Sequence, residues 1–260
     1  MRFFAAPEQI TKNHTTQIAQ ITIVGEDIDY MRNVLRLKPG EQVIICDGMG
    51  TDYVCVLESL TKERALCRAL SFSKNTNELP FAITLYQGLP KNPKTDIIIQ
   101  KAVELGVYQI VFVETSRSVA KIKDTEKKIN RFQKIARAAA MQSQRGIVPK
   151  IGITNFACAT ENIKGLGLIA HEKESNTTLR QAFSVGGIYE RKFSESHCKD
   201  IALFIGPEGG FSEEEIDKAT AAKIIPFTLG PRILRTETAA ITATAIITYE
   251  LGFFDMHGEK

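Results

Sequence analysis

The chain has 260 residues, 43% of them hydrophobic and 24% charged, which are ordinary values for a globular protein and suit two modest domains or one large one. No apolar run approaches the roughly 18 residues that a membrane-spanning helix needs. The N-terminus lacks the apolar core of a signal peptide. We therefore expect a cytoplasmic protein that has no membrane partner.

The net charge of +3 is unevenly distributed along the chain. Residues 91–150 carry 13 basic and 5 acidic groups, whereas residues 1–77 carry 9 of each. This basic block is a candidate surface for a polyanion, although part of it is equally well explained as the solvated face of a helix. The four His and five Cys show no metal-ligand spacing and no C-x-x-C pair, so we expect no metal site, and buried, reduced thiols.

The first 70 residues are rich in short β-forming runs, at 21–24, 42–46, 53–59 and 64–70, separated by Gly and Pro turn signals. This spacing predicts a small barrel or sandwich, with a short helix at 29–37 that ends before Pro39. The polar stretch 71–80 is the best linker candidate. The expected domains are therefore residues 1–72 and 78–260.

Strands and helices alternate in the second half. Apolar runs at 81–88, 109–115, 165–172, 201–206 and 224–230 are typical of buried parallel strands. Helices are expected at 94–106, 125–145, 212–223 and 236–252; Ser212 with Glu215 three residues later forms a capping-box pattern. This alternation predicts an α/β domain with a mostly parallel sheet.

Two loops follow buried strands and combine glycines with polar side chains. In IGPEGGFS (205–212) the glycines allow backbone to approach a ligand closely, and Glu208 disfavours phosphate. In LGPRILRTETAA (229–240), Arg and Glu crowd one loop, which is costly unless they meet partners or a ligand. Residues 142–151, QSQRGIVPKI, place Gln and Arg at a helix end, where they either contact nucleic acid or stay solvated.

The chain resembles the RsmE family, bacterial 16S rRNA (uracil-N3) methyltransferases of the SPOUT superfamily. The resemblance lies in five segments that occur in the same order: 33–50, 97–119, 135–151 and then these two loops. The resemblance covers nearly the whole chain. It implies an N-terminal PUA-like β-barrel that binds RNA, an α/β SPOUT domain with a C-terminal trefoil knot, and a homodimer with cofactor sites near its interface. The chain departs from the family pattern at Tyr30 or Met31, at Met141-Gln142 and at Ser116.

The resemblance also implies S-adenosylmethionine as cofactor and 16S rRNA of the small ribosomal subunit as partner. Its cofactor-binding positions fall on Ala170, His171, Gly206, Glu208, Gly209, Gly210, Leu229, Gly230, Leu234 and Arg235. We expect RNA contacts from Arg2, Arg32, Arg36, Lys38, Lys91, Arg117, Gln142 and Arg145.

Attack by uracil N3 requires loss of its proton, so catalysis is mostly positioning plus stabilisation of the developing anion. Arg235 or Arg232 could stabilise that charge, and Glu237 could accept the proton or only orient the arginine. N3 lies on the Watson–Crick edge, so the target base must be unpaired or flipped.

Three other functions remain as alternatives. A non-catalytic RNA-binding or ribosome-assembly factor would use the same barrel and basic block, and cofactor binding would distinguish it. A related methyltransferase acting on another RNA site is a second alternative. A nicotinamide-dependent dehydrogenase is disfavoured, because no Gly-rich fingerprint follows the first strand of the α/β domain.

Overall fold

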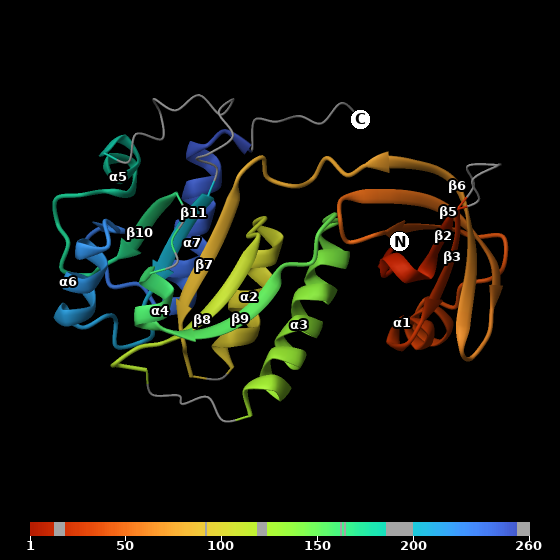
Figure 1. Ribbon diagram of the computed structural model, residues 1–260, viewed down its shortest axis with the longest axis horizontal. Helices are drawn as coiled ribbons and strands as arrows, with labels where there is room; N and C mark the ends of the chain where they lie inside the picture. Colours follow the sequence, from red (N-terminus) through yellow and green to blue (C-terminus); the bar gives the residue numbers. More distant parts are fainter. Residues whose placement is uncertain are drawn as a thin grey trace. The chain divides into compact units, whose positions relative to one another are not determined.

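The computed structural model describes residues 1–12, 19–91, 93–118, 124–161, 163, 165–185 and 200–253. These residues form two compact units (Figure 1). Unit 1 comprises Met1–Glu78 and Ala140–Val148, and unit 2 comprises Leu79–Ala139 and the chain from Pro149 onward. The division after Glu78 lies close to the expected linker. The sequence did not predict that residues 140–148 belong to the first unit.

Unit 1 is built on one six-stranded sheet, and the expectation of a β-rich first domain is confirmed. The strand order is β1-β4-β5-β6-β3-β2, with β1 parallel to β4 and the other pairs antiparallel. Alternate residues of the strands enclose a single core that includes Phe3, Ile21, Ile45 and Leu57. The strands are β1 (Arg2–Phe4), β2 (Ile10–Lys12), β3 (Ala19–Val24), β4 (Gln42–Cys46), β5 (Thr51–Leu60) and β6 (Arg64–Lys74).

Two expectations for this unit need correction. Strand β6 continues to Lys74, so residues 71–74 are paired strand and not linker. The helix expected at 29–37 begins earlier, as α1 (Glu26–Asp29) followed by a π-helical turn, η2 (Tyr30–Val34), and Arg36 then takes a left-handed φ of 55°. Met31 is fully buried in the core and Met141 packs against it, so both side chains serve packing.

Unit 2 contains a six-stranded sheet in the order β12-β10-β11-β7-β8-β9, in which every pairing is parallel, and this confirms the α/β expectation. Its strands are β7 (Ala82–Gly88), β8 (Gln109–Glu114), β9 (Lys150–Asn155), β10 (Leu166–Ala170), β11 (Asp200–Ile205) and β12 (Ile225–Phe227). Its helices are α2 (Lys94–Glu104), α3 (Thr125–Gln142), α4 (Phe156–Glu161), α5 (Leu179–Val185), α6 (Glu213–Ala221) and α7 (Thr236–Glu250). Strand β9 was not predicted because it directly follows a stretch with Gly146 and Pro149, and helices α4 and α5 were not predicted because they have only 6 and 7 residues.

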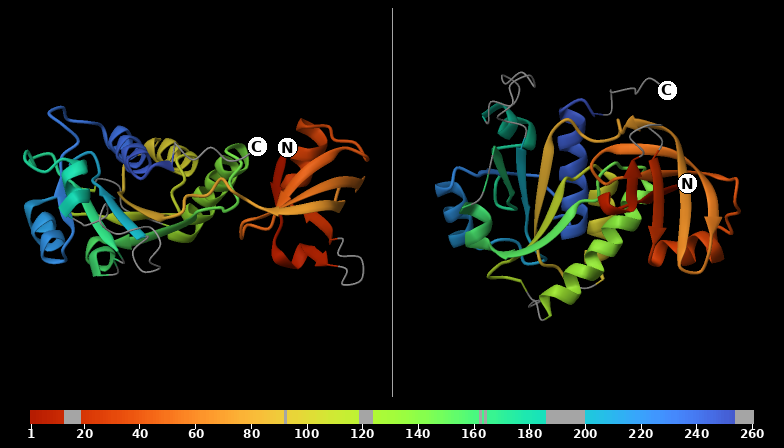
Figure 2. Two further views of the ribbon diagram at one scale, coloured as in Figure 1. Left: turned by 90° about the horizontal axis from the view of Figure 1, so that it is seen from above. Right: turned by 45° about the vertical axis from the view of Figure 1, so that its right-hand side comes forward.

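Helices cover both faces of this sheet (Figure 2). On one face, α4 and α6 enclose a core around Phe204, which stacks on Tyr86 at 4.4 Å and meets Phe156 edge-on at 6.1 Å. Helix α7 packs against α2 and β11. These helices leave the carboxyl ends of the central strands available for loops that can bind a ligand.

The cysteines of the described residues differ in their burial. Cys46, Cys55 and Cys67 are buried, whereas Cys158 is exposed, so the expectation of buried thiols is wrong for Cys158. Cys198 lies outside the described residues. Burial raises the pKa of the Cys46 thiol to about 11, so the group stays protonated and donates to Gly146 O at 3.1 Å.

Neither a metal cluster nor a membrane span is found in the described ranges. No three or more His, Cys, Asp or Glu side chains gather there in a way that could hold a metal ion. None of the helices in that part of the chain combines the length and apolarity that a membrane crossing requires.

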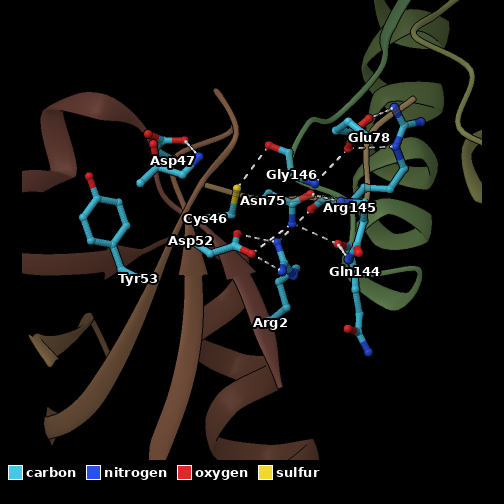
Figure 3. Close-up of polar contacts among 12 residues, drawn as sticks. Arg2, Cys46, Asp47, Asp52, Tyr53, Asn75, Glu78, Gln144, Arg145 and Gly146 are labelled. Carbon is cyan, nitrogen blue, oxygen red and sulfur yellow. Dashed lines mark hydrogen bonds and ion pairs between the residues drawn. The ribbon is translucent and has the colours of Figure 1, made fainter. Parts of the chain in front are cut away.

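A buried polar network joins residues 140–148 to the strands of unit 1 (Figure 3). The Arg2 guanidinium donates to both oxygens of Asp52, at 2.7 and 2.6 Å, and to the carbonyl of Arg145 at 2.9 Å. Arg145, only 3% exposed, pairs with Glu78 at 2.6 Å. Glu78 Oε1 also accepts from the backbone amides of Gly146 and Ile147. One carboxylate therefore satisfies a guanidinium and two amides in the same turn.

We expect Glu78→Gln to lower the free energy of unfolding by about 3–5 kcal/mol, because it removes the carboxylate charge that pairs with the buried Arg145 guanidinium. Glu58→Gln is the matched control, since the Glu58–Arg68 pair is roughly 34–45% exposed and should contribute less than about 1 kcal/mol. Urea unfolding of both variants measures the difference. Equal destabilisation by the two would contradict the structural role of Glu78.

Candidate functional site

Three loops follow neighbouring parallel strands of unit 2. Residues 171–178 follow β10, residues 206–212 follow β11 and residues 228–235 follow β12. Parallel neighbours end at the same edge of a sheet, so these loops meet there. Backbone hydrogen bonds join the first loop to the third: His171 N donates to Phe227 O at 3.0 Å, and Thr228 N donates to Thr177 O at 2.8 Å.

The loops enclose a pocket of about 660 Å³, within the range of small-molecule sites. Nine of the ten predicted cofactor-binding residues line it; only Gly209 does not. The Gly209 carbonyl instead accepts a hydrogen bond from Arg117 at 3.1 Å. Further lining residues are Lys94, Glu172, Glu174, Ser175, Thr178, Ile205, Pro207, Phe211, Thr228, Pro231, Arg232, Ile233, Thr236 and Ala239.

Glycine is required where the second loop leaves the sheet. A Cβ on Gly206 would lie 3.0 Å from Gly210 Cα, and Gly210 itself has a φ of +66°. A Cβ on Gly88, at the end of β7, would lie 2.4 Å from Pro207 Cδ and 2.5 Å from Pro207 N. The loop therefore runs directly over the β7 terminus, with no room for a side chain beneath it.

Buried polar side chains fasten the second loop to the start of α7. Thr236 Oγ1 donates to Gly206 O at 2.6 Å and accepts from Gln87 Nε2 at 2.8 Å. At the other end of the loop, the predicted capping box of Ser212 and Glu215 is present, and Glu215 also accepts from Ser116 N at 2.8 Å. The loop is therefore held at both ends before any ligand binds.

The three predicted catalytic residues lie in and beside the third loop. Arg232 and Arg235 are exposed and line the pocket, and neither guanidinium has an ion-pair partner among the described residues. Glu237 lies 3.4 Å from the ammonium of Lys94, where the sequence had suggested an arginine partner. Sequence reasoning missed Lys94, because it had counted only as one cation of the basic block.

Lys94 and Glu208 form an ion pair at 3.1 Å on the pocket wall. Burial acts to lower the pKa of Lys94, but the neighbouring carboxylates of Glu208 and Glu237 outweigh it and raise that pKa above its usual value. Burial likewise acts to raise the pKa of Glu208, and its hydrogen bonds to backbone amides and to Lys94 outweigh this and lower it. Both groups are therefore charged at neutral pH.

The predicted RNA contacts fall into two groups. Arg2 and Arg145 are buried in the network of unit 1, where their guanidinium groups already bind protein atoms. This burial counts against a direct role for either in RNA binding. The others are exposed or half-buried: Arg32, Arg36, Lys38 and Gln142 in unit 1, and Lys91 and Arg117 in unit 2.

Known proteins resemble the chain along most of its length. Residues 77–248 match the family model of an RNA methyltransferase domain, and residues 23–70 match an RNA methyltransferase PUA domain. The ribosomal RNA small subunit methyltransferase E of Bacillus subtilis is 34% identical over 249 residues, covering 93% of this chain and 94% of its own length.

Solved structures agree with this similarity. A ribosomal RNA small subunit methyltransferase E from Neisseria gonorrhoeae, bound to S-adenosyl methionine, is 30% identical with a TM-score of 0.79, over 96% of this chain and 97% of its own. A methyltransferase from Legionella pneumophila, in complex with SAM, is 29% identical with a TM-score of 0.81 over the same shares. Both likenesses span the two units.

Proposed function

Because this chain belongs to the family of the ribosomal RNA small subunit methyltransferases E, we propose that it transfers a methyl group from S-adenosylmethionine to N3 of a uridine in 16S ribosomal RNA. The observation that carries this proposal is the meeting of three strand-end loops around one pocket. The reaction takes place in the cytoplasm, on RNA of the small ribosomal subunit. The target base is unpaired or flipped when it is modified.

The pocket suits the cofactor in size and chemistry. Backbone held close by Gly206 and Gly210 can approach a flat adenosine, with apolar contacts from Leu229 and Leu234. Carboxylates on the wall, among them Glu172 and Glu174, favour a positively charged sulfonium. The bound cofactor supplies an activated methyl carbon. The carbonyl of Gly209 accepts a hydrogen bond from Arg117, which ties this loop to the segment after β8.

The chain's own residues position the base and stabilise its charge. N3 attacks only after losing its proton to water, and the negative charge that develops on the uracil needs a cation nearby. Arg235 supplies that cation, or Arg232 on the same loop, because both guanidinium groups face the pocket without an ion-pair partner in the described part of the chain. Glu237, held against Lys94, orients this segment and does not pair with either arginine.

Two structural features of the family belong to the same proposal: the trefoil knot and the homodimer. The knot is supported by the path of the chain after the edge strand β12. It returns past the end of β11, where Thr236 binds Gly206 O, so that α7 packs against α2 and β11. The homodimer is supported by α7, which presents Ile241, Ala245, Ile246 and Tyr249 as half-buried or exposed side chains.

Mapping of modified nucleosides by mass spectrometry tests the proposed activity. Small-subunit RNA from cells that lack this protein should lose one N3-methyluridine, and the purified protein with S-adenosylmethionine should restore it. Saturable cofactor binding without any methylated nucleoside would instead favour a different RNA target. No cofactor binding at all would favour the assembly-factor alternative.

RNA binding is assigned to exposed cations of unit 1. We expect the triple variant Arg32→Ala, Arg36→Ala and Lys38→Ala to bind RNA more weakly, because each side chain neutralises a phosphate. The slope of log affinity against log salt should fall by about 2–3, with cofactor affinity unchanged.

The matched control removes three other cations of the same unit, through Lys62→Ala, Arg64→Ala and Arg68→Ala. This control has the same net charge as the test variant. An equal loss of RNA affinity in the two triple variants would show that total charge, and not the 32–38 segment, decides binding.

A further inference from the structure

Lys94 lies at a position that is unfavourable for a cation by local rules. It is the first residue of α2, where the helix dipole presents partial positive charge. Its side chain is only 25% exposed. A cation that is both partly buried and set against the dipole must gain compensating interactions elsewhere, and such departures from local preference are expected at functional sites.

Two carboxylates from separate segments of the chain supply that compensation. Lys94 Nζ lies 3.1 Å from Glu208 Oε1, in the loop after β11, and 3.4 Å from Glu237 Oε2, in the first turn of α7. The amide of Lys91 also donates to Glu208 at 3.1 Å. One ammonium group therefore meets two carboxylates that are 29 positions apart: Glu208, which lines the pocket, and Glu237, which follows the pocket residue Thr236.

The contact with Lys94 stabilises the charge of Glu237. Glu237 Oε2 is a buried atom with no hydrogen bond in the described part of the chain, so Lys94 is its ionic neighbour. A buried carboxylate without a counter-charge is strongly unfavourable. Without Lys94, Glu208 and Glu237 would repel each other and move apart, and their loops would move with them.

We infer that Lys94 is a positioning residue, which fixes residues 206–212 and the start of α7 to helix α2 and so preforms the cofactor pocket. This inference rests on the proposed function. It assigns Lys94 an effect on cofactor affinity that passes through Glu208 and Glu237 and not through direct contact with the ligand. Arginine, which can reach two carboxylates, preserves the link.

A double-mutant analysis by calorimetry with S-adenosylmethionine tests the inference. Lys94→Met should weaken cofactor binding at least 10-fold, and Lys94→Arg should stay within 3-fold of the unmodified protein. In a Glu208→Gln, Glu237→Gln background, adding Lys94→Met should weaken binding by less than 3-fold further. Lys101→Met is the matched control on the same helix, since Lys101 pairs with Glu104 at the surface and does not line the pocket.

The outcomes separate the inference from the proposed function. If the unmodified protein does not bind the cofactor, the proposed function fails. If it binds and Lys94→Met binds equally well, the inference fails alone. A full additional loss in the double-Gln background would show direct ligand contact and also overturn it. Should Lys94→Met not fold, as judged by circular dichroism, the Lys94→Arg and Glu208→Gln, Glu237→Gln variants still test the inference. A loss of cofactor affinity in Lys94→Arg as large as that in the double variant rejects the positioning role.

Discussion

Replacing Arg235 with alanine is expected to lower the rate of methyl transfer by about 10²–10³-fold, the usual effect of removing a preorganised donor at a developing anion. The guanidinium lines the pocket, is exposed, and has no ion-pair partner in the described ranges, so its charge is available to the substrate. Cofactor affinity should change by less than about 10-fold, because an interaction made only in the transition state lowers kcat without altering binding.

Two further variants complete this experiment. Arg232→Ala decides between the two arginines of the loop: the larger loss of kcat identifies the residue that stabilises the base. Arg131→Ala is the control, because Arg131 pairs with Asp96 on the surface of unit 2 and neither residue lines the pocket. Methyl transfer to small-subunit particles and calorimetry give the two readouts. Near-normal turnover in both Arg235→Ala and Arg232→Ala would exclude the third loop as the source of the catalytic charge.

Replacing Gly88 with alanine is expected to weaken S-adenosylmethionine binding by at least about 10-fold. The added Cβ would lie 2.4–2.5 Å from atoms of Pro207 and 2.9 Å from the carbonyl carbon of Gly206, so the backbone of the cofactor loop must move. Overpacking of this kind costs about 1–3 kcal/mol, here at the point where the loop begins. The effect on affinity arises although Gly88 does not itself line the pocket.

Gly152→Ala is the matched control within the same sheet. Among the described residues, its added Cβ would meet Val111 alone, at 3.7 Å from Cγ2 and 3.9 Å from Cγ1, which is ordinary van der Waals contact. Calorimetry measures cofactor affinity for both variants, and urea unfolding measures their stability. If Gly88→Ala bound the cofactor as tightly as Gly152→Ala, the loop would not depend on its close approach to β7.

The sequence predicted long or strongly patterned elements well and short ones poorly. Strand β4 was predicted at its observed bounds, because a short apolar run between turn signals marks it. Helix α2 begins at Lys94 as expected, and Gly106 marks its end. Strands β1 and β2 have three residues each and were missed. Three residues carry no periodicity, and only pairing with β4 and β3 makes them strands.

Arg145 shows what charge patterning alone could not resolve. As a basic residue at a helix end it was predicted to bind RNA, yet it is 3% exposed and paired with Glu78. Glu78 lies 67 positions earlier in the chain. The burial of a charge depends on such distant partners, which no local pattern reveals.

By itself the sequence determined which two loops are candidates for the cofactor site, because glycines at strand ends and the order of the motifs are local properties of the chain. Only the tertiary structure decided that these loops share one pocket, that Glu237 faces Lys94, and that residues 140–148 complete the first unit. The physical reason is that ion pairs and close backbone contacts form between positions far apart in the chain. Their geometry exists only once the parallel strands have set the loops side by side.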